Sequence, residues 1–186
     1  MIKKILICLF VMLLCMFPKV VYAEDLKLAP NAASSVLMEA STKQVLYSSH
    51  ETDKLFPAST TKIMTMILMF EAINKETLKW DDVLTCSAYA ASMGGSQIYL
   101  EEGEQMSVSD LFKGISIASA NDACVMVGER IAGTNDGFVK MMNEKAKELN
   151  LTNTHFMNPT GLHDDNHYTC ALDLGLMASY LMQIGG

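Results

Sequence analysis

The sequence predicts an α+β fold in which a strand hairpin precedes a helix-rich region. Two short runs of β-prone residues, 35–40 and 43–47, are separated by two hydroxyl residues, a spacing typical of a hairpin. Beyond them, apolar residues recur at helical spacing, most clearly within residues 59–74 and 136–149. The strands therefore come first, and helices make up most of the remaining chain.

Helix start and stop signals divide the helix-rich region into separate elements. Ser107 and Thr134 are typical helix-capping residues, and Gly133 ends the helix that precedes Thr134. Residues 150–168 lack a regular pattern and are expected to be mostly loop. The predicted elements are helices at 59–74, 107–118, 122–131, 136–149 and 169–181, and a short strand near 97–100.

The first 23 residues have the layout of a secretory signal peptide. Lys3 and Lys4 precede an apolar run at 5–17, and Ala23 stands at the expected cleavage site. The apolar run is too short for an ordinary membrane span, which needs ~20 residues. An uncleaved anchor is the alternative. We expect an exported, extracytoplasmic protein of the cell envelope whose mature part begins at residue 24.

Composition argues against several classes of function. The chain carries 21 acidic and 14 basic residues, for a net charge of −7, and such an acidic chain is a poor nucleic-acid binder. Cys86, Cys124 and Cys170 are too few and too widely spaced for a disulfide framework or a zinc site. One internal pair could form among them, and the sequence does not say which.

Residues 163–167, His-Asp-Asp-Asn-His, are of metal-ligating types, but they follow Asn-Pro-Thr-Gly in a predicted loop. A structural role is favoured there, and no metal site is predicted.

Ser59 and Lys62 form the strongest catalytic candidate. Three positions apart at the start of a helix, they lie on one face about one turn from each other. A serine hydroxyl becomes a good nucleophile when a base takes its proton, and lysine is a base only when its amine is uncharged. Burial against the apolar residues that follow would lower its pKa from ~10.4. The alternative is a helix cap beside a solvated lysine.

Ser119 and Asn121 form a second polar pair at the turn between two predicted helices. A second hydroxyl can relay a proton, and an asparagine amide offers a substrate amide both a donor and an acceptor. Taken alone, the same residues could simply cap a helix. The two motifs in this order are more specific than either one.

Together these motifs resemble those of the serine D-alanyl-D-alanine carboxypeptidases, the low-molecular-weight penicillin-binding proteins. The resemblance covers nearly all of the mature region and is carried by segments 36–40, 57–65, 118–123 and 155–162. It implies the serine β-lactamase/penicillin-binding transpeptidase-like fold, with an antiparallel sheet and a helical subdomain.

The resemblance also implies a role for each candidate. Ser59 would be the acylated nucleophile, Lys62 its general base, Ser119 a proton relay and Asn121 a contact to the peptide backbone of the substrate. The implied reaction removes the terminal D-alanine from a peptidoglycan stem peptide through an acyl-enzyme, without metal or organic cofactor. β-Lactam antibiotics are the other implied ligands.

One motif of the family is missing. The family carries Lys-Thr-Gly on a later strand, but no lysine or arginine follows Lys147 here. We therefore expect residues 24–186 to be an incomplete catalytic domain, truncated at its C-terminus. The segment expected beyond residue 186 would include the closing strands of the sheet and any part that associates with a membrane.

Two alternatives remain. A β-lactamase shares the Ser-x-x-Lys chemistry, but class A enzymes usually carry their deacylation base in Glu-x-x-Leu-Asn, and Ala146 stands where that glutamate would be. A non-catalytic module that binds penicillin or peptidoglycan is the other.

Overall fold

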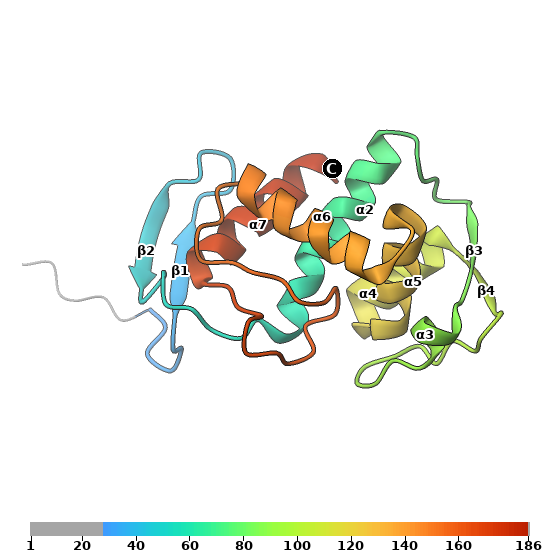
Figure 1. Ribbon diagram of the computed structural model, residues 1–186. Coiled ribbons are helices and arrows are strands. Elements are labelled where there is room, and N and C mark those ends of the chain that lie inside the picture. Colours follow the sequence, from blue (N-terminus) through green and yellow to red (C-terminus); the bar gives the residue numbers. More distant parts are fainter. Residues whose placement is uncertain (1–27, 186) are drawn as a thin grey trace, which may run out of the picture. The chain divides into compact units, whose positions relative to one another are not determined.

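The computed structural model describes residues 28–185, and contacts divide the chain into two units, residues 1–31 and 32–186. The helices and strands described here belong to the second unit (Figure 1). The predicted signal peptide lies outside the described residues. Within residues 28–185, no helix combines the length and apolar character needed to cross a membrane.

The elements are β1 (Ser35–Met38), β2 (Val45–Ser49), the 3₁₀ turn η1 (Ala58–Thr61), α2 (Lys62–Asn74), β3 (Val83–Thr85), α3 (Ala88–Ala91), β4 (Gln105–Ser107), α4 (Val108–Ala118), α5 (Asn121–Ala132), α6 (Asn135–Glu148) and α7 (Ala171–Ile184).

The predicted N-terminal hairpin is confirmed. Strands β1 and β2 pair antiparallel, with Ser35 opposite Ser49 and a shift in register after Leu37. The connection is organised by the Glu39 carboxylate, which accepts hydrogen bonds from the backbone N–H and hydroxyl of Thr42, both at 2.6 Å. Hydrogen bonds between a carboxylate and the residues of a turn hold the hairpin connection in one conformation.

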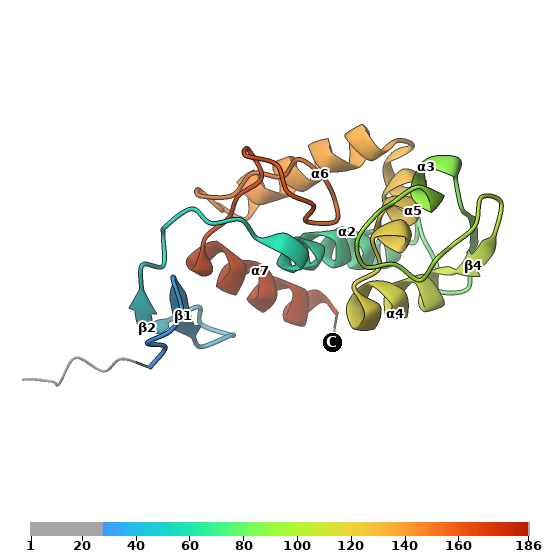
Figure 2. The same cartoon turned by 90° about the horizontal axis from the view of Figure 1, so that it is seen from below.

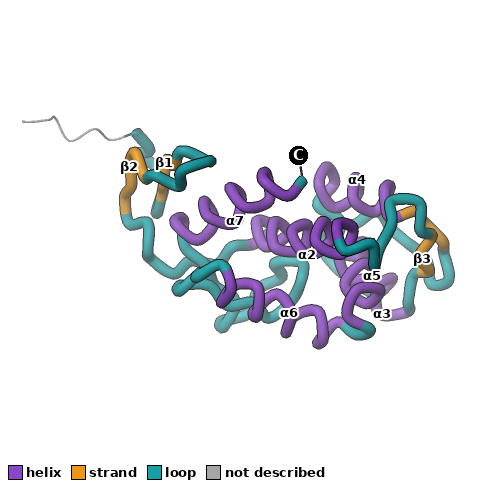
Figure 3. The backbone as a smooth tube through the Cα atoms, turned by 90° about the horizontal axis from the view of Figure 1, so that it is seen from above, coloured by secondary structure: helices purple, strands orange, loops and turns teal. Residues whose placement is uncertain are grey.

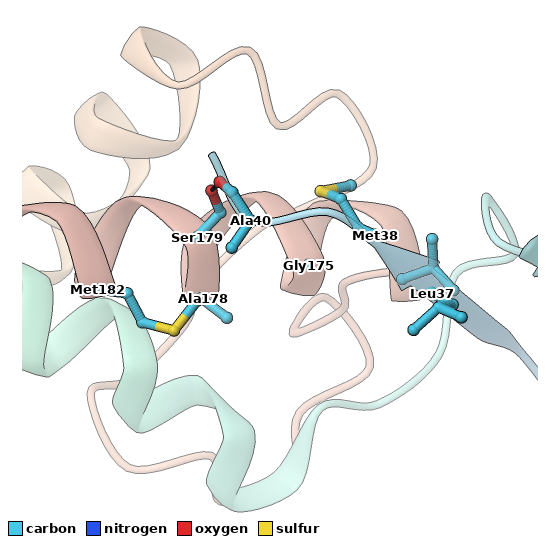
Figure 4. Close-up of a pocket in the computed structure, with 8 residues that line it drawn as sticks. Leu37, Met38, Ala40, Gly175, Ala178, Ser179 and Met182 are labelled. Atoms are coloured by element: carbon cyan, nitrogen blue, oxygen red, sulfur yellow. Dashed lines mark hydrogen bonds between the residues drawn. The ribbon is translucent and has the colours of Figure 1, made fainter. Parts of the chain in front are cut away.

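Helix α7 packs against the hairpin at Gly175, a helix residue that has no side chain. A Cβ built on Gly175 would lie 3.2 Å from Val36 Cγ1, so the glycine allows β1 to approach the helix closely. The Ser179 hydroxyl donates a hydrogen bond to the Ala40 carbonyl oxygen (Figure 4). A mostly apolar groove runs along this junction; its lining consists of Val36, Leu37, Met38, Ala40, Gly175, Ala178, Ser179 and Met182.

Helix α2 is the central element of the helical part. It runs between α7 and α6 (Figure 3), and it also packs against α4 and α5 (Figure 2). One of its faces places Met69 in a core cluster with residues of α4 and α5. Another face places Met64 and Ile67 in a second cluster with residues of α6 and α7. Because apolar neighbours surround it, α2 is apolar on most of its circumference, as expected for a buried helix.

Helices α4 to α7 follow the sequence prediction closely, whereas the short helix α3 was not predicted and the helix expected from residue 59 begins with the 3₁₀ turn η1. Ser107 caps α4 by accepting a hydrogen bond from the Asp110 N–H at 3.1 Å, and Thr134 caps α6 in the same way through Gly137 at 3.0 Å. Helix α7 starts two residues later than predicted, with Cys170 as its N-cap, because the Thr169 backbone instead pairs with Leu55.

The strand predicted near residues 97–100 is wrong. The backbone N–H groups of Ile98 and Leu100 donate to the carboxylate of Asp122, at 3.2 and 3.0 Å, rather than to a neighbouring strand. Tyr99 between them adopts a φ of +61°, which is incompatible with extended backbone. The second antiparallel pair forms instead from β3 and β4, which the sequence pattern did not reveal.

Candidate active site

The structure places Ser59 and Lys62 side by side. Ser59 lies on the exposed η1 turn, and Lys62 is the first residue of α2. The Lys62 side chain runs into the interior, with only 3% of the residue exposed, and its Nζ lies 3.4 Å from Ser59 Oγ. If the lysine is uncharged, this distance lets the serine O–H donate toward Nζ, the arrangement needed to activate a nucleophile.

The surroundings of Lys62 favour the uncharged amine. Its Nζ donates a hydrogen bond to the Thr160 carbonyl oxygen at 2.7 Å, and within residues 28–185 no carboxylate forms an ion pair with it. Burial lowers the pKa of Lys62 below its ordinary value, and the nearby Cys124 opposes this only in part. A buried amine without a counter-charge loses its proton more readily because the charged form is poorly solvated.

A glycine contact fixes the backbone just before Ser59. A Cβ on Gly161, whose φ is +89°, would lie 1.8 Å from the Ala58 carbonyl oxygen. Ala58 itself adopts a φ of +47°, a sparsely populated conformation that the surrounding structure must hold. The loop that carries Gly161 is closed by Asn158, whose Oδ1 accepts from the N–H groups of Thr160 and Gly161 at 3.1 and 2.8 Å.

Two further hydrogen bonds join the start of α2 to the same loop, and sequence reasoning missed both. Thr61 Oγ1 lies 2.8 Å from His167 Nε2, and Thr65 Oγ1 donates to the Pro159 carbonyl oxygen at 2.8 Å. Both threonines are fully buried. The sequence did contain one indication of these hydrogen bonds. Thr61 and Thr65 lie four positions apart in a mostly apolar segment, and buried hydroxyls need hydrogen-bond partners.

Ser119 and Asn121 lie at the corner between α4 and α5, and neither side chain caps a helix. Ser119 is the C-cap residue of α4 and adopts a φ of +56°. Ala120 is the N-cap residue of α5, and its side chain makes no capping hydrogen bond. Asn121 donates from its backbone N–H to the Ser96 carbonyl and from Nδ2 to the Gly94 carbonyl, at 2.8 and 2.7 Å. The capping alternative raised by the sequence is therefore not what these side chains do.

Both residues of this corner keep an unused polar atom. Ser119 Oγ and Asn121 Oδ1 are buried, and in the described part of the chain neither has a hydrogen-bond partner. Buried polar atoms of this kind are uncommon, and each calls for an explanation. Cys124, one turn beyond Asn121 on α5, lies close enough to Lys62 to influence its pKa. The α5 helix thus brings this corner toward the lysine, although no hydrogen bond joins Ser119 to Ser59 or Lys62 among residues 28–185.

The three cysteines in the described region are free thiols. Cys86, Cys124 and Cys170 are all buried, so none of the pairings that the sequence left open is formed. Burial raises the pKa of the Cys124 thiol to about 12, and the thiol is therefore uncharged at neutral pH. Within residues 28–185, no group of three or more histidine, cysteine or acidic side chains is arranged to hold a metal ion.

Comparisons with known proteins agree with the motifs. The family model Peptidase_S11, D-alanyl-D-alanine carboxypeptidase, matches residues 21–185. The D-alanyl-D-alanine carboxypeptidase DacF of Bacillus subtilis is 50% identical over 177 residues, which cover 93% of this chain and 46% of that protein. The chain spans about half the length of the curated relatives it matches.

Solved structures share the fold. Penicillin binding protein 6B from Escherichia coli matches with a TM-score of 0.78 at 36% identity, covering 82% of this chain and 50% of that one. Penicillin-binding protein D2 from Listeria monocytogenes, in its ampicillin-bound form, matches with a TM-score of 0.72 at 29% identity, covering 82% and 62%. These matches confirm the predicted α+β, penicillin-binding type of fold. From the family model and the shared fold together, we conclude that the chain belongs to the D-alanyl-D-alanine carboxypeptidase family.

Proposed function

We propose that the protein is a serine-type D-alanyl-D-alanine carboxypeptidase that removes the terminal D-alanine from peptidoglycan stem peptides. The observation that carries this proposal is the 3.4 Å approach of the buried Lys62 amine to the Ser59 hydroxyl. A lysine that is buried without a carboxylate partner can serve as a general base near neutral pH. The names of the curated relatives support the substrate class.

In the proposed reaction, uncharged Lys62 takes the Ser59 hydroxyl proton as Oγ attacks the carbonyl carbon between the last two D-alanines. The bond from this carbon to the nitrogen of the terminal D-alanine then breaks. The proton passes to that nitrogen, with Ser119 as the relay, and D-alanine leaves as the free amine. A water molecule attacks the resulting ester and returns a proton to Ser59, which completes the cycle.

Backbone and amide groups would stabilise the reacting peptide. The Ser59 N–H lies just before a helix of 13 residues, and we propose that it supplies half of the oxyanion hole. Asn121 would contact the peptide backbone of the substrate. Its buried and unpartnered Oδ1 supports a role for this corner beyond holding the fold together.

β-Lactams are the other proposed ligands, because one relative, penicillin-binding protein D2 from Listeria monocytogenes, is known in ampicillin-bound and cefotaxime-bound forms. Action on peptidoglycan requires a site outside the cytoplasm, which fits the signal peptide proposed for residues 1–23. Residues 24–186 would then form part of the catalytic domain, and a further C-terminal segment would supply any membrane association. A β-lactamase is less well supported, because the buried Ala146 offers no base for deacylation.

The test uses a fluorescent penicillin and a stem-peptide mimic ending in D-alanyl-D-alanine. Because the chain spans about half the length of its relatives, it is assayed alone and joined to the C-terminal part of the Bacillus subtilis relative. We expect covalent labelling that Ser59→Ala abolishes and that Ser116→Ala, at an exposed serine of α4, leaves unchanged.

Release of D-alanine from the mimic would support the carboxypeptidase. Fast turnover of penicillin with no D-alanine release would instead favour a β-lactamase. Labelling that survives Ser59→Ala, or no labelling in either protein, would overturn the proposed nucleophile.

A further inference from the structure

His167 is a buried histidine that the proposed reaction does not use. Only 2% of the residue is exposed, and its ring packs edge-on against Phe156, with ring centroids 5.7 Å apart. Its Nε2 lies 2.8 Å from Thr61 Oγ1, and its Nδ1 lies 3.3 Å from the backbone nitrogen of Met157. Both ring nitrogens therefore have partners, one on the loop and one on the turn that carries Ser59.

These partners determine which nitrogen carries the proton. The Met157 backbone N–H can only donate, so Nδ1 must accept with its lone pair. In a neutral imidazole the proton then sits on Nε2, which donates it to the Thr61 hydroxyl oxygen. A protonated ring would turn Nδ1 into a second donor facing the Met157 N–H, and that contact would be lost.

The environment keeps the ring neutral. Burial lowers the pKa of His167 to about 4; the Asp164 carboxylate acts in the opposite direction, and the His155 imidazole lowers it further. Among residues 28–185, Asp164 and His155 are the titratable side chains that act on the ring. From about pH 5 upward, His167 is thus expected to keep the tautomer that donates to Thr61.

Thr61 is the point through which His167 can reach the catalytic pair. It is fully buried, ends the η1 turn that carries Ser59, and directly precedes Lys62. The loop is joined to this first turn by two other bonds, in which Lys62 and Thr65 donate to loop carbonyl oxygens. The hydrogen bond from His167 runs in the opposite direction, from the loop to the η1 turn, and its acceptor, Thr61, directly precedes the proposed base.

We propose that His167 is a positioning residue whose Nε2–H, donated to Thr61, holds the η1 turn so that Ser59 stays within reach of Lys62. This inference rests on the proposed function for its kinetic consequence, but not for its geometry. A loosened turn would lengthen the contact between Ser59 and Lys62 and admit water to the lysine. Small displacements of reacting groups can cost up to about 100-fold in rate.

The kinetic test compares two variants in the chain and in the completed protein described above. His167→Phe keeps the ring volume but removes both hydrogen bonds, and we expect it to slow acylation by penicillin about 10-fold to 100-fold. His167→Gln can donate from Nε2 and accept at Oε1, and it should recover acylation to within about threefold of wild type, judged against the Phe variant. His163→Gln, at an exposed histidine of the same loop, is the matched control and should leave the rate unchanged.

Two outcomes of this comparison would overturn the proposal. One is acylation at the wild-type rate in His167→Phe. The other is a glutamine variant that is as slow as the phenylalanine variant although its thermal unfolding is normal.

A second readout does not depend on activity. Nitrogen NMR of the histidine ring at pH 7 should show a neutral His167 protonated on Nε2, and carbon NMR should show that His167→Phe raises the pKa of Lys62. A charged ring, or a proton on Nδ1, would overturn the proposal even in an active enzyme. If penicillin labels neither protein, the proposed function fails, whereas the NMR result still decides the role of His167.

Discussion

Lys62, the first residue of α2, and Lys145, on α6, are both buried, yet their surroundings shift the pKa of the two amines in opposite directions. Lys62, at the start of the helix, donates to a carbonyl oxygen and approaches a serine hydroxyl, and burial lowers its pKa. Burial acts on Lys145 in the same direction, but hydrogen bonds and charges from Glu148 and Glu71 outweigh it and raise its pKa. The Glu71 Oε1 atom lies 2.6 Å from the Lys145 Nζ, near the other end of α2. Burial alone therefore does not make a lysine into a base; the lack of a carboxylate partner is also required.

Replacing Lys62 should have the largest effect on activity. Lys62→Met removes the proposed general base, and acylation by penicillin should fall by about 100-fold to 10,000-fold. Folding should be little affected, because methionine does not incur the desolvation cost of the amine, although the Thr160 carbonyl loses its donor. Stopped-flow labelling and thermal unfolding measure the two effects. Lys113→Met, at an exposed lysine of α4, is the control. Unchanged acylation in Lys62→Met would contradict the proposal that Lys62, unlike Lys145, acts as a base.

Replacing Lys145 should lower stability and leave acylation unchanged, the opposite of the result expected for Lys62. Lys145→Met leaves the Glu71 carboxylate, which is 13% exposed, without its closest positive charge. Removing one partner of a buried ion pair typically costs about 3–5 kcal/mol of unfolding free energy. Urea unfolding measures this loss, and acylation of the folded fraction should be unchanged. Adding Glu71→Gln should restore part of the stability, because it removes the unpaired charge. A double variant less stable than Lys145→Met would show that the ion pair is not the cause.

A carboxylate placed beside Lys62 should make it resemble Lys145. Acylation is expected to rise with pH as Lys62 loses its proton. Cys124→Asp would place a negative charge near the amine, favour its charged form and raise its pKa. The rising limb of the pH–rate profile should then shift to higher pH by about one unit or more, with a roughly 10-fold slower reaction at pH 7. Cys124→Ser adds no charge and should leave the profile in place. A shift toward lower pH would contradict the electrostatic argument.

The smallest effect is expected at the outer partner of Lys145. The Glu148 side chain is 63% exposed, so Glu148→Gln should lower the unfolding free energy by less than about 1 kcal/mol. Glu144→Gln, in a looser and exposed pair with Lys140, should change it even less. Chemical unfolding of the two variants side by side measures the difference. A loss as large as that of Lys145→Met would mean that Glu148, rather than Glu71, is the main partner.

Local patterns predicted much of the fold and the proximity of Ser59 to Lys62. The hairpin and the capped helices depend on neighbours within a few residues, and Ser107 and Thr134 act as their positions suggested. The proximity of Ser59 and Lys62 follows from helical spacing alone. These features required no knowledge of which distant segments meet.

Contacts between distant segments could not be predicted in this way. The Asp122 carboxylate accepts hydrogen bonds from the N–H groups of Ile98 and Leu100, which are 24 and 22 residues away, and this prevents the expected strand. His167 reaches Thr61 across 106 residues, and the sequence indicated only that its loop was structural. Such hydrogen bonds depend on the packed arrangement of α2, α5 and the loop, which no local pattern encodes.

The contact between Gly161 and the Ala58 carbonyl has a consequence for how the chain tolerates change. Any side chain at 161 would collide with the backbone just ahead of Ser59, and flexible neighbours could not relieve the collision because the obstructing atom is a backbone carbonyl oxygen. In a saturation mutagenesis screen scored by antibiotic capture, position 161 should tolerate as few replacements as position 59. A residue with no reactive side chain would thus look as indispensable as Ser59, the proposed nucleophile, because the backbone at 161 leaves no room for a side chain.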